Sequence, residues 1–320
     1  MIVTFTPNPS IDKTISLAEP LQRGEVQRAT DATVQAGGKG INVARVLAYA
    51  GEQAVAVLAI TDEAFNAELV ASGLPGACRV VQGGIRVRTN TAITEPDGTT
   101  TKVNEPGPTL TPEQVQAAQD ELIARAADAD WAILSGSLPP GAPTDWYAQL
   151  VKALKPLGCK VAVDTSDAAL EALLDGLPEA SFDLIKPNSD ELAQLTGGDA
   201  AAFEASAEAG DVDAIVEAAR GLQARGIANV MVTLGGAGAV LVTAEGAWYT
   251  TAPKVEVKST VGAGDSSVAG FVLASVRGEK PDGCLRTAAS YGSGAAGLPG
   301  TSLPRPDDIH PERADVRRVL

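Results

Sequence analysis

Residues 211–234 read DVDAIVEAARGLQARGIANVMVTL, and this stretch decides the fold. Its first part has a helical pattern from Asp211 to Arg225, and Gly226 ends the predicted helix. The apolar run from Val230 to Leu234 then has the length and composition of a buried strand. A helix followed at once by a buried strand is typical of the repeating unit of a parallel α/β sheet.

The same alternation continues through the chain. Short apolar runs predict further buried strands at Ile2 to Phe5, Ala54 to Ile60, Trp131 to Leu134, Val161 to Asp164 and Asp183 to Lys186. A helix is predicted from Gly40 to Ala50, where Gly51 ends it, and Thr111-Pro112-Glu113 opens another. We therefore expect a doubly wound, mostly parallel sheet with helices on both faces.

Two regions have a different pattern. Alternation with a period of two runs through Thr14 to Val34 and through Ile85 to Glu105, where Pro96-Asp97-Gly98 predicts a turn. Both leave the α/β core and return to it, so we expect a small β-sheet lid built from two insertions. The predicted core is residues 1–12, 35–84 and 106–320, and the predicted lid is residues 13–34 and 85–105.

The composition excludes several classes of protein. The chain has 25 basic and 40 acidic residues, a net charge of -15, which disfavours nucleic acid and anionic membranes as partners. The N-terminus lacks a signal-peptide pattern, and Cys78, Cys159 and Cys284 are too scattered for a disulfide framework or a zinc site, so we expect a cytoplasmic protein. The lone histidine, His310, argues against Ser-His or Cys-His catalysis.

The strongest chemical signal is Ser259-Thr260-Val261-Gly262-Ala263-Gly264-Asp265-Ser266, followed by a helical pattern from Ser267 to Val276. Glycines at a helix start allow free amides and the positive end of the helix dipole to converge on an anion. A carboxylate there suits a base that deprotonates a hydroxyl attacking a bound phosphoryl group. Alternatively, Asp265 simply occupies a favourable position in the first turn of a helix.

A second glycine-rich motif is Gln35-Ala36-Gly37-Gly38-Lys39-Gly40-Ile41-Asn42. Its glycines allow close approach of a ligand, while Lys39 and Asn42 supply a charge and an amide suited to a phosphorylated polyhydroxy compound. The spacing is not that of a Walker A loop. An ordinary strand-to-helix turn explains the motif equally well.

The segment Lys186-Pro187-Asn188-Ser189-Asp190-Glu191 has two interpretations. Asn188 and Glu191 are spaced as a reciprocal helix cap, which the local pattern favours. The same two residues are also suited to ordering a magnesium ion and its waters near nucleotide phosphates.

Two glycine-containing segments remain. Leu134-Ser135-Gly136-Ser137-Leu138-Pro139-Pro140-Gly141 follows a predicted strand, where its hydroxyl groups suit either binding of sugar or phosphate oxygens or a plain loop. Gly292-Ser293-Gly294-Ala295-Ala296-Gly297 matches the dinucleotide pattern GxGxxG. It follows a helical segment and too little chain remains after it for a βαβ unit, so we expect small residues for helix packing instead.

Taken together and in this order, GGKGxN, SGSLPPG, KPNxxE and TVGAGD resemble the ribokinase-like carbohydrate kinases of the PfkB family over nearly the whole chain. The segments Thr6 to Asp12 and Asn104 to Gly107 are similar to the branch that contains 1-phosphofructokinase and tagatose-6-phosphate kinase. The resemblance implies Mg²⁺-dependent transfer from ATP to a sugar phosphate, a lid that closes over the sugar, and homodimers formed through the lids.

The resemblance also implies roles for individual residues. The catalytic base would be Asp265, with an anion hole formed by Gly262, Ala263 and Gly264. The sugar phosphate would be bound by Asp12, Gly37, Gly38, Lys39, Asn42, Arg88, Lys102 and Ser137, of which Lys39, Arg88 and Lys102 are the candidates for its phosphate. The nucleotide would be bound by Lys186, Asn188, Thr233, Gly235, Gly238, Gly264 and Ser293, and Glu191 would hold the metal through water.

The expected reaction is direct transfer of the γ-phosphoryl group of ATP to fructose 1-phosphate, giving fructose 1,6-bisphosphate. Tagatose 6-phosphate and fructose 6-phosphate are alternative substrates. A regulator that binds a sugar phosphate without catalysis is an alternative of another class, although such a protein has no need of a base at an anion site.

Overall fold

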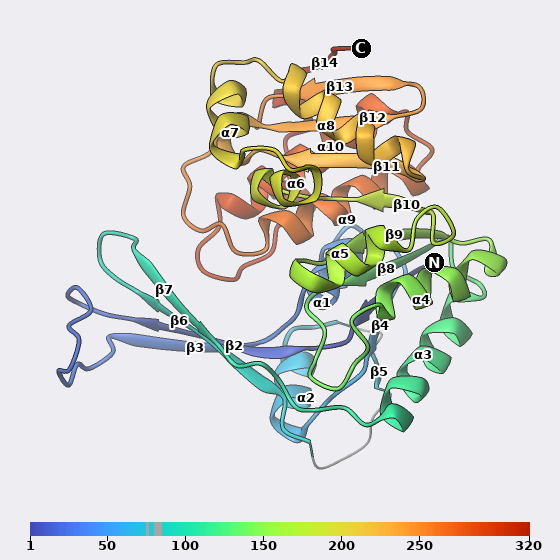
Figure 1. Ribbon diagram of the computed structural model, residues 1–320. Helices are drawn as coiled ribbons and strands as arrows, with labels where there is room; N and C mark the ends of the chain where they lie inside the picture. The colour runs from blue at the N-terminus through green and yellow to red at the C-terminus, as the bar shows by residue number, and fades with distance from the viewer. Residues whose placement is uncertain (75–76, 80–84) are drawn as a thin grey trace.

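The computed structural model describes residues 1–74, 77–79 and 85–320 and is built around one large sheet (Figure 1). Its ten strands lie in the order β14-β13-β12-β11-β10-β9-β8-β1-β4-β5. Their bounds are β1 Ile2–Thr6, β4 Ala54–Leu58, β5 Ala77–Arg79, β8 Trp131–Ser135, β9 Lys160–Asp164, β10 Phe182–Ile185, β11 Ile227–Thr233, β12 Ala239–Thr243, β13 Gly246–Thr250 and β14 Val316–Arg318. Each buried strand predicted from an apolar run is present.

The seven strands from β5 to β11 are parallel, as predicted. The first strand, β1, lies inside the sheet between β4 and β8, so the chain builds outward on one side and then on the other. In such sheets ligands bind beyond the carboxyl ends of the strands, near the point where the winding direction changes. The boundary of the predicted core at residue 84 lies outside the described residues.

One edge of the sheet was not predicted. Strands β11 to β14 pair antiparallel, with Val232 opposite Val240 and Leu241 opposite Trp248. The turn between β12 and β13 is short enough for a hairpin, whereas parallel neighbours need a longer crossover. The sheet is therefore mixed, with a parallel centre and an antiparallel edge.

Helices cover both faces of this sheet. Their bounds are α1 Lys39–Tyr49, α2 Glu63–Ala71, α3 Pro112–Ala126, α4 Trp146–Leu154, α5 Asp167–Asp175, α6 Ser189–Thr196, α7 Ala200–Glu208, α8 Asp213–Ala224, α9 Ala263–Val276 and α10 Pro281–Ala296. Helices α1 and α3 both contact β1, and α8 and α10 both contact β12, so the doubly wound arrangement is confirmed.

Local sequence signals explain where these helices begin. Thr111 and Gln114 form a reciprocal capping box at the start of α3. Helix α9 begins earlier than its apolar pattern suggested, at Ala263, because Gly262 adopts the left-handed conformation and turns the chain into the helix. Helix α10 contains Gly292 to Ala296 of the GxGxxG match and ends before Gly297; Gly292 leaves room for the Ser267 side chain of α9, as expected for helix packing.

Large aromatic side chains fill the centre of the core. Phe5 of β1 and Trp146 of α4 are fully buried and meet edge to face, with their ring centroids 5.4 Å apart. Helix α9 is buried from Asp265 to Ala274 because it packs against α10 and α1, and its Phe271 meets Trp131 of β8 edge to face.

A second, four-stranded sheet projects from the body of the molecule (Figure 1). Its order is β3-β2-β6-β7, with bounds β2 Ser10–Ser16, β3 Asp31–Gly37, β6 Arg88–Thr94 and β7 Thr100–Asn104. The two insertions therefore form one sheet, as expected. The strands reach further into the core than the predicted boundaries at residues 12 and 35, whereas residues 17–30 form a loop and not strands.

Two further findings concern the cysteines and the length of the helices. Cys159 and Cys284 are buried free thiols. Within the described ranges, no helix combines the length and apolar character needed to cross a bilayer.

Candidate active site

The carboxyl ends of the parallel strands bring the predicted motifs together. Asp164 and Thr233 are the last residues of β9 and β11, and Lys186 directly follows β10. Asn188 forms a bridge with Thr233, which joins the KPNxxE segment to the loop that follows β11. Residues far apart in the sequence thus line one open edge of the sheet.

The N-terminus of α9 forms an anion site at this edge. Gly262 has a φ of 77°. Of the three predicted anion-hole residues, Gly262 and Gly264 have amides that donate to no acceptor in the described part of the chain, as does Asp265, whereas the Ala263 amide donates to the carbonyl of Thr260 at 3.4 Å. Free amides and the helix dipole favour a negative charge here. A Cβ on Gly264 would lie 3.2 Å from the Lys186 ammonium, so that cation lies directly against the helix start.

Asp265 is buried in the first turn of α9, with 8% of its surface exposed. Its Oδ2 accepts a hydrogen bond of 2.8 Å from Nδ2 of Asn42 in α1. Burial, and secondarily the nearby Asp164 charge, raise the pKa of Asp265 to about 6. A carboxylate with a pKa near 6 is ionised at neutral pH and is a better proton acceptor than an ordinary aspartate.

A buried carboxylate not singled out from the sequence lies between two lysines. Oδ1 of Asp164 is 3.2 Å from Nζ of Lys39 and 3.6 Å from Nζ of Lys186. Burial alone would raise the pKa of Asp164, but Lys186 and then Lys39 lower it, so the group stays ionised. Burial likewise opposes the charge of Lys39, and Asp164, Asp265 and Glu191 together raise its pKa.

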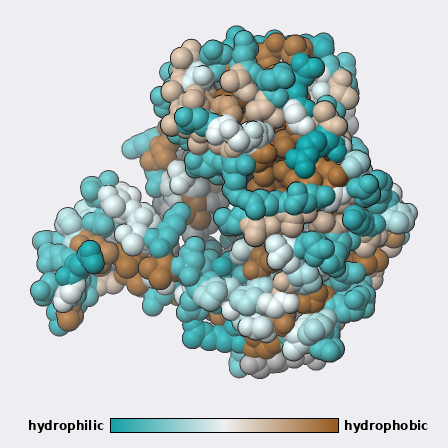
Figure 2. Space-filling model, viewed as in Figure 1, coloured by the Kyte–Doolittle hydropathy of each residue, from teal (hydrophilic) through white to brown (hydrophobic). Residues whose placement is uncertain are grey.

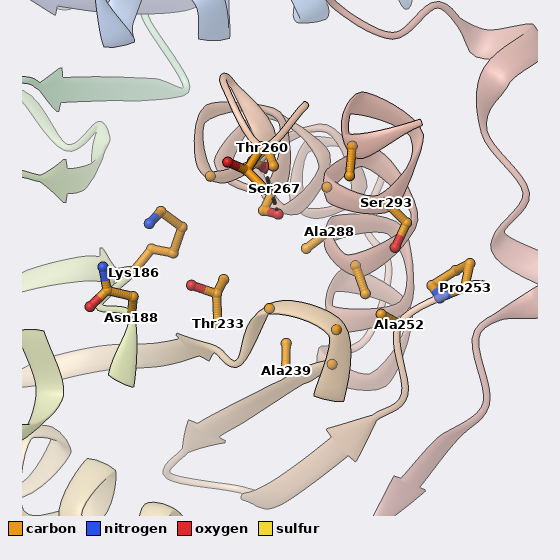
Figure 3. Close-up of a pocket in the computed structure, with 18 of the residues that line it drawn as sticks. Lys186, Asn188, Thr233, Ala239, Ala252, Pro253, Thr260, Ser267, Ala288 and Ser293 are labelled. Carbon is orange, nitrogen blue, oxygen red and sulfur yellow. Dashed lines mark hydrogen bonds between the residues drawn. The ribbon is translucent and has the colours of Figure 1, made fainter. Parts of the chain in front are cut away.

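A cavity of about 730 Å³ opens beside the anion site (Figure 3). All seven residues predicted to bind a nucleotide line it: Lys186, Asn188, Thr233, Gly235, Gly238, Gly264 and Ser293. Figure 3 shows Lys186 and Asn188 at one end and Ala252, Pro253 and Ser293 at the other. The cavity is therefore polar and cationic at one end and mostly apolar at the other, which suits the phosphates and the base of a nucleotide.

The loop at the floor of this cavity is held in place by its glycines. Gly238 has a φ of 110°, and a Cβ there would overlap the carbonyl oxygen of Thr250. The Tyr249 hydroxyl donates a 2.7 Å hydrogen bond to the carbonyl of Ala237. The apolar wall, which includes Ala252, Pro253, Val255 and Ala288, was not predicted, because small apolar residues carry no recognisable motif.

The lid carries a second set of polar groups near the start of α1. Oδ1 of Asp12 accepts hydrogen bonds from Ser10 (2.7 Å) and Asn90 (3.1 Å), and burial raises the pKa of Asp12. A Cβ on Gly37 would overlap the Asp12 carboxylate, so glycine is required at this position for the observed geometry. Glycine is also favoured at position 38, for another reason: the backbone there has a φ of 133°.

Arg88 and Lys102 lie on the same face of the lid as Asp12 by strand register. Arg88 is half-buried, donates to the carbonyl of Glu105, and has a buried Nε without a hydrogen-bond partner in the described chain. Burial lowers the pKa of Arg88, and Asp12 opposes this. Lys102 is exposed further along the lid. The geometry therefore favours Arg88 over Lys102 as the group that faces a bound anion.

Asn8 connects the lid to the core and was not singled out from the sequence. Its Nδ2 donates to the carbonyl of Pro106 at 3.1 Å and to Oγ of Ser137 at 3.3 Å. Asn8 is 3% exposed, and a Cβ on Gly107 would overlap its amide oxygen. Ser137 therefore lies at the junction of the lid strand and the loop after β8.

The predicted cap and the predicted metal contact involve the same residues. Asn188 and Glu191 form a reciprocal capping box, with hydrogen bonds of 2.8 and 3.0 Å, so the structural interpretation is confirmed. The charge of Glu191 also contributes to the raised pKa of Lys39. No cluster of three or more possible metal ligands exists in residues 1–74, 77–79 and 85–320. One nearby carboxylate fits Mg²⁺, which keeps most of its waters and uses substrate phosphates as ligands.

Comparisons with known proteins decide the family. The model of the pfkB family of carbohydrate kinases matches residues 6–308. The chain belongs to this family. It is 37% identical to a 1-phosphofructokinase of Haloferax volcanii over 97% of this chain and 95% of that protein. It is 36% identical to a 1-phosphofructokinase of Rhodobacter capsulatus over 96% and 94% of the two chains.

Among solved structures, phosphofructokinase-2 of Escherichia coli in complex with potassium is similar to this pfkB-family chain, with a TM-score of 0.84. The two are 28% identical, and the similarity covers 96% of each chain. The family resemblance drawn from the motifs and the fold drawn from the strand pattern are thus both confirmed, and a carbohydrate kinase of this family uses ATP as its co-substrate.

Proposed function

We propose that this pfkB-family kinase transfers the γ-phosphoryl group of ATP to the free primary hydroxyl of fructose 1-phosphate. The observation that carries the proposal is the position of Asp265. It lies in the first turn of α9 beside Gly264, which lines the cavity together with Lys186, and it accepts a hydrogen bond from Asn42 of α1, the helix that follows lid strand β3. A base in that position has a phosphoryl donor on one side and a sugar on the other. The named relatives support this choice of sugar.

The sugar would bind between the lid and α1. The Asp12 carboxylate is oriented by Ser10 and Asn90 and is suited to accept hydrogen bonds from sugar hydroxyls. The phosphate already on the sugar would pair with Arg88, whose guanidinium makes no ion pair within the described residues and has an unpartnered Nε. Lys39, Gly38 and Asn42 would complete the site at the start of α1.

The transfer step then follows from the geometry. As the sugar oxygen attacks the γ-phosphorus, its O–H bond breaks and the proton passes to the Asp265 carboxylate. The bond between the γ-phosphorus and the bridging oxygen breaks, and ADP leaves. The free amides at Gly264 and Asp265 and the Lys186 ammonium stabilise the charge on the transferred group. Asn42 keeps the carboxylate oriented throughout.

Mg²⁺ held near Glu191 through water would neutralise charge on the nucleotide phosphates when it is bound. The lid would exclude water from the site. Its polar face, which carries Asp12, Arg88 and Asn90, is turned toward the bound sugar. A closed lid would also suppress hydrolysis of ATP by water.

The direct test of this assignment is Asp265→Asn. The substitution keeps the size and hydrogen-bonding geometry of the side chain but removes its basicity. Turnover should fall by about 10³-fold or more, while binding of fructose 1-phosphate, measured by calorimetry, stays within a few fold of the wild type. Turnover near the wild-type rate would remove Asp265 from the role of base.

We further propose that the lids of two copies pair. On the face opposite Asp12, strand register brings together Ile15, Val34, Ile93 and Val103. Val34 and Val103 are 41% and 60% exposed, and Figure 2 shows apolar side chains on the projecting sheet. Lys13 and Thr91 also lie on this face, between Val34 and Val103. Its exposed apolar side chains favour a protein partner, and a second copy of the lid offers a matching surface.

A further inference from the structure

The two lysines of the site come from opposite sides of the proposed transfer point. Lys39 begins α1, immediately after the lid strand β3 ends at Gly37. Lys186 follows β10, lines the nucleotide cavity and lies against Gly264. They are 147 positions apart (186 − 39) and belong to different elements, so the backbone alone does not fix one relative to the other.

Asp164 links them. Its single oxygen Oδ1 lies 3.2 Å from the Lys39 ammonium and 3.6 Å from the Lys186 ammonium. Asp164 is 3% exposed and ends the central strand β9, whose backbone is paired on both sides, so the carboxylate is the most rigid of the three groups. Lysine side chains are flexible and are bound as point charges, and they need such a partner to hold one geometry.

We propose that Asp164 is a positioning residue that fixes Lys39 on the sugar side and Lys186 on the nucleotide side of the transferred phosphoryl group. This inference rests on the proposed kinase reaction and on Asp265 as its base. Asp164 and the two ammonium groups together carry one net positive charge, which the ionised Asp265 balances until it accepts the proton of the sugar hydroxyl. From that point one positive charge is available to the transferred group, whereas two lysines each paired with its own carboxylate would offer none.

The same arrangement acts on Asp265. Four groups from three elements face its carboxylate: Asp164 from β9, Lys39 and Asn42 from α1, and Lys186 after β10. Asp164 raises the pKa of Asp265, whereas Lys39, Asn42 and Lys186 lower it. Removing the Asp164 charge would therefore lower the pKa of Asp265 and leave both lysines free to move toward it.

Two substitutions of Asp164 distinguish the effect of its position from the effect of its charge. Asp164→Asn removes the charge but keeps an acceptor oxygen; we expect kcat/KM to fall on the order of 10²-fold and KM to rise for both substrates. The acid limb of the pH profile of kcat/KM should also move to lower pH. Asp164→Glu keeps the charge on a longer side chain; we expect KM to rise for both substrates while the acid limb stays in place.

Asp183→Asn is the matched control. Asp183 lies on the neighbouring strand β10, is partly buried whereas Asp164 is fully buried, and accepts a hydrogen bond from the backbone of Val161, away from the site. This variant should show a changed thermal unfolding midpoint and wild-type kinetics. If Asp164→Asn also changes only the unfolding midpoint and leaves both KM values and the acid limb unchanged, the positioning role is wrong.

Asp164→Asn leaves two buried cations without a counter-charge and has the greater risk of not folding. In that case Asp164→Glu decides, because a rise in both KM values supports the inference and unchanged values overturn it. The kinase assignment has a separate test. It is contradicted by full turnover in Asp265→Asn, whatever the Asp164 variants do.

Discussion

The side-chain amide of Asn42 donates a 2.8 Å hydrogen bond to the carboxylate of Asp265, although the two residues are 223 positions apart in the sequence. This contact joins the start of α1, next to the lid, to the start of α9, next to the cavity lined by Lys186 and Gly264. The two glycine-rich motifs of the sequence therefore form one site, and their shared centre is a buried carboxylate with a raised pKa.

The raised pKa of Asp265 predicts the pH dependence of activity. Because the carboxylate must be ionised to accept a proton, kcat/KM should rise through about pH 6 as the pH increases. Initial rates measured from pH 5 to pH 8 at low sugar phosphate concentration check this. An acid limb near pH 4, the range of an ordinary aspartate, would show that the burial of Asp265 does not control its ionisation.

The same shift predicts a stability cost at the active site. A carboxyl group whose pKa is raised on folding stabilises the folded state below its unfolded pKa, and this contribution is lost as the pH rises through about 6. The amide introduced by Asp265→Asn does not titrate, so this variant should gain stability relative to the wild type, on the order of 1 to 3 kcal/mol at pH 8. Urea unfolding at pH 5 and pH 8 measures this. An equal difference at both pH values would contradict it.

Substitution of Gly37 should weaken binding of the sugar phosphate and leave binding of the nucleotide unchanged. In Gly37→Ala the new Cβ overlaps the Asp12 carboxylate, so Asp12 must move from its hydrogen bonds with Ser10 and Asn90. We expect KM for the sugar phosphate to rise about tenfold or more, with KM for ATP unchanged. The control is Gly221→Ala in α8, where a Cβ meets nothing within 4 Å. It should leave kinetics unchanged and add about 0.5 to 1 kcal/mol of stability.

Arg88 should determine binding of the phosphate already on the sugar. Arg88→Gln removes a guanidinium suited to paired hydrogen bonds with phosphate, and KM for fructose 1-phosphate should rise about 10- to 100-fold. Lys102→Gln, on the same face of the lid but exposed, should change KM only a few fold. The reverse order of the two effects would place the phosphate further along the lid.

The exposed face of the lid should control assembly. Val103→Asp places a charge in the apolar face formed with Ile15, Val34 and Ile93, and light scattering should show a shift from dimer to monomer. Val70→Asp is the control, since Val70 of α2 is 71% exposed outside the lid. A wild-type monomer, or a dimer that survives Val103→Asp, would contradict pairing through this face.

Most of the fold could be predicted because parallel strands buried on both faces appear as continuous apolar runs, as at Trp131 to Leu134. The hairpin of β12 and β13 was missed, although Ala239 to Val242 is also a continuous, buried apolar run. The lid boundaries differ from the predicted ones by a few residues, because the break after β1 falls at Pro7-Asn8-Pro9 and β2 already begins at Ser10.

The site was predictable where its residues occur in motifs and not where they occur singly. Lys39, Asn42, Asn188 and Asp265 all belong to recognisable segments, whose roles remain predictions. Asp164 belongs to no recognisable motif. A single aspartate where a strand ends and a loop begins cannot be distinguished by sequence from an ordinary surface residue. Only the folded chain brings it to Lys39, 125 positions away in sequence.

The most direct test of the central claim is a comparison of three substrates. ADP formation from Mg-ATP would be measured with fructose 1-phosphate, fructose 6-phosphate and tagatose 6-phosphate, and kcat/KM compared. We predict a preference for fructose 1-phosphate of at least about tenfold, lost in Asp265→Asn. A preference for either 6-phosphate would contradict the assigned substrate, and no turnover with any of the three would contradict the kinase function itself.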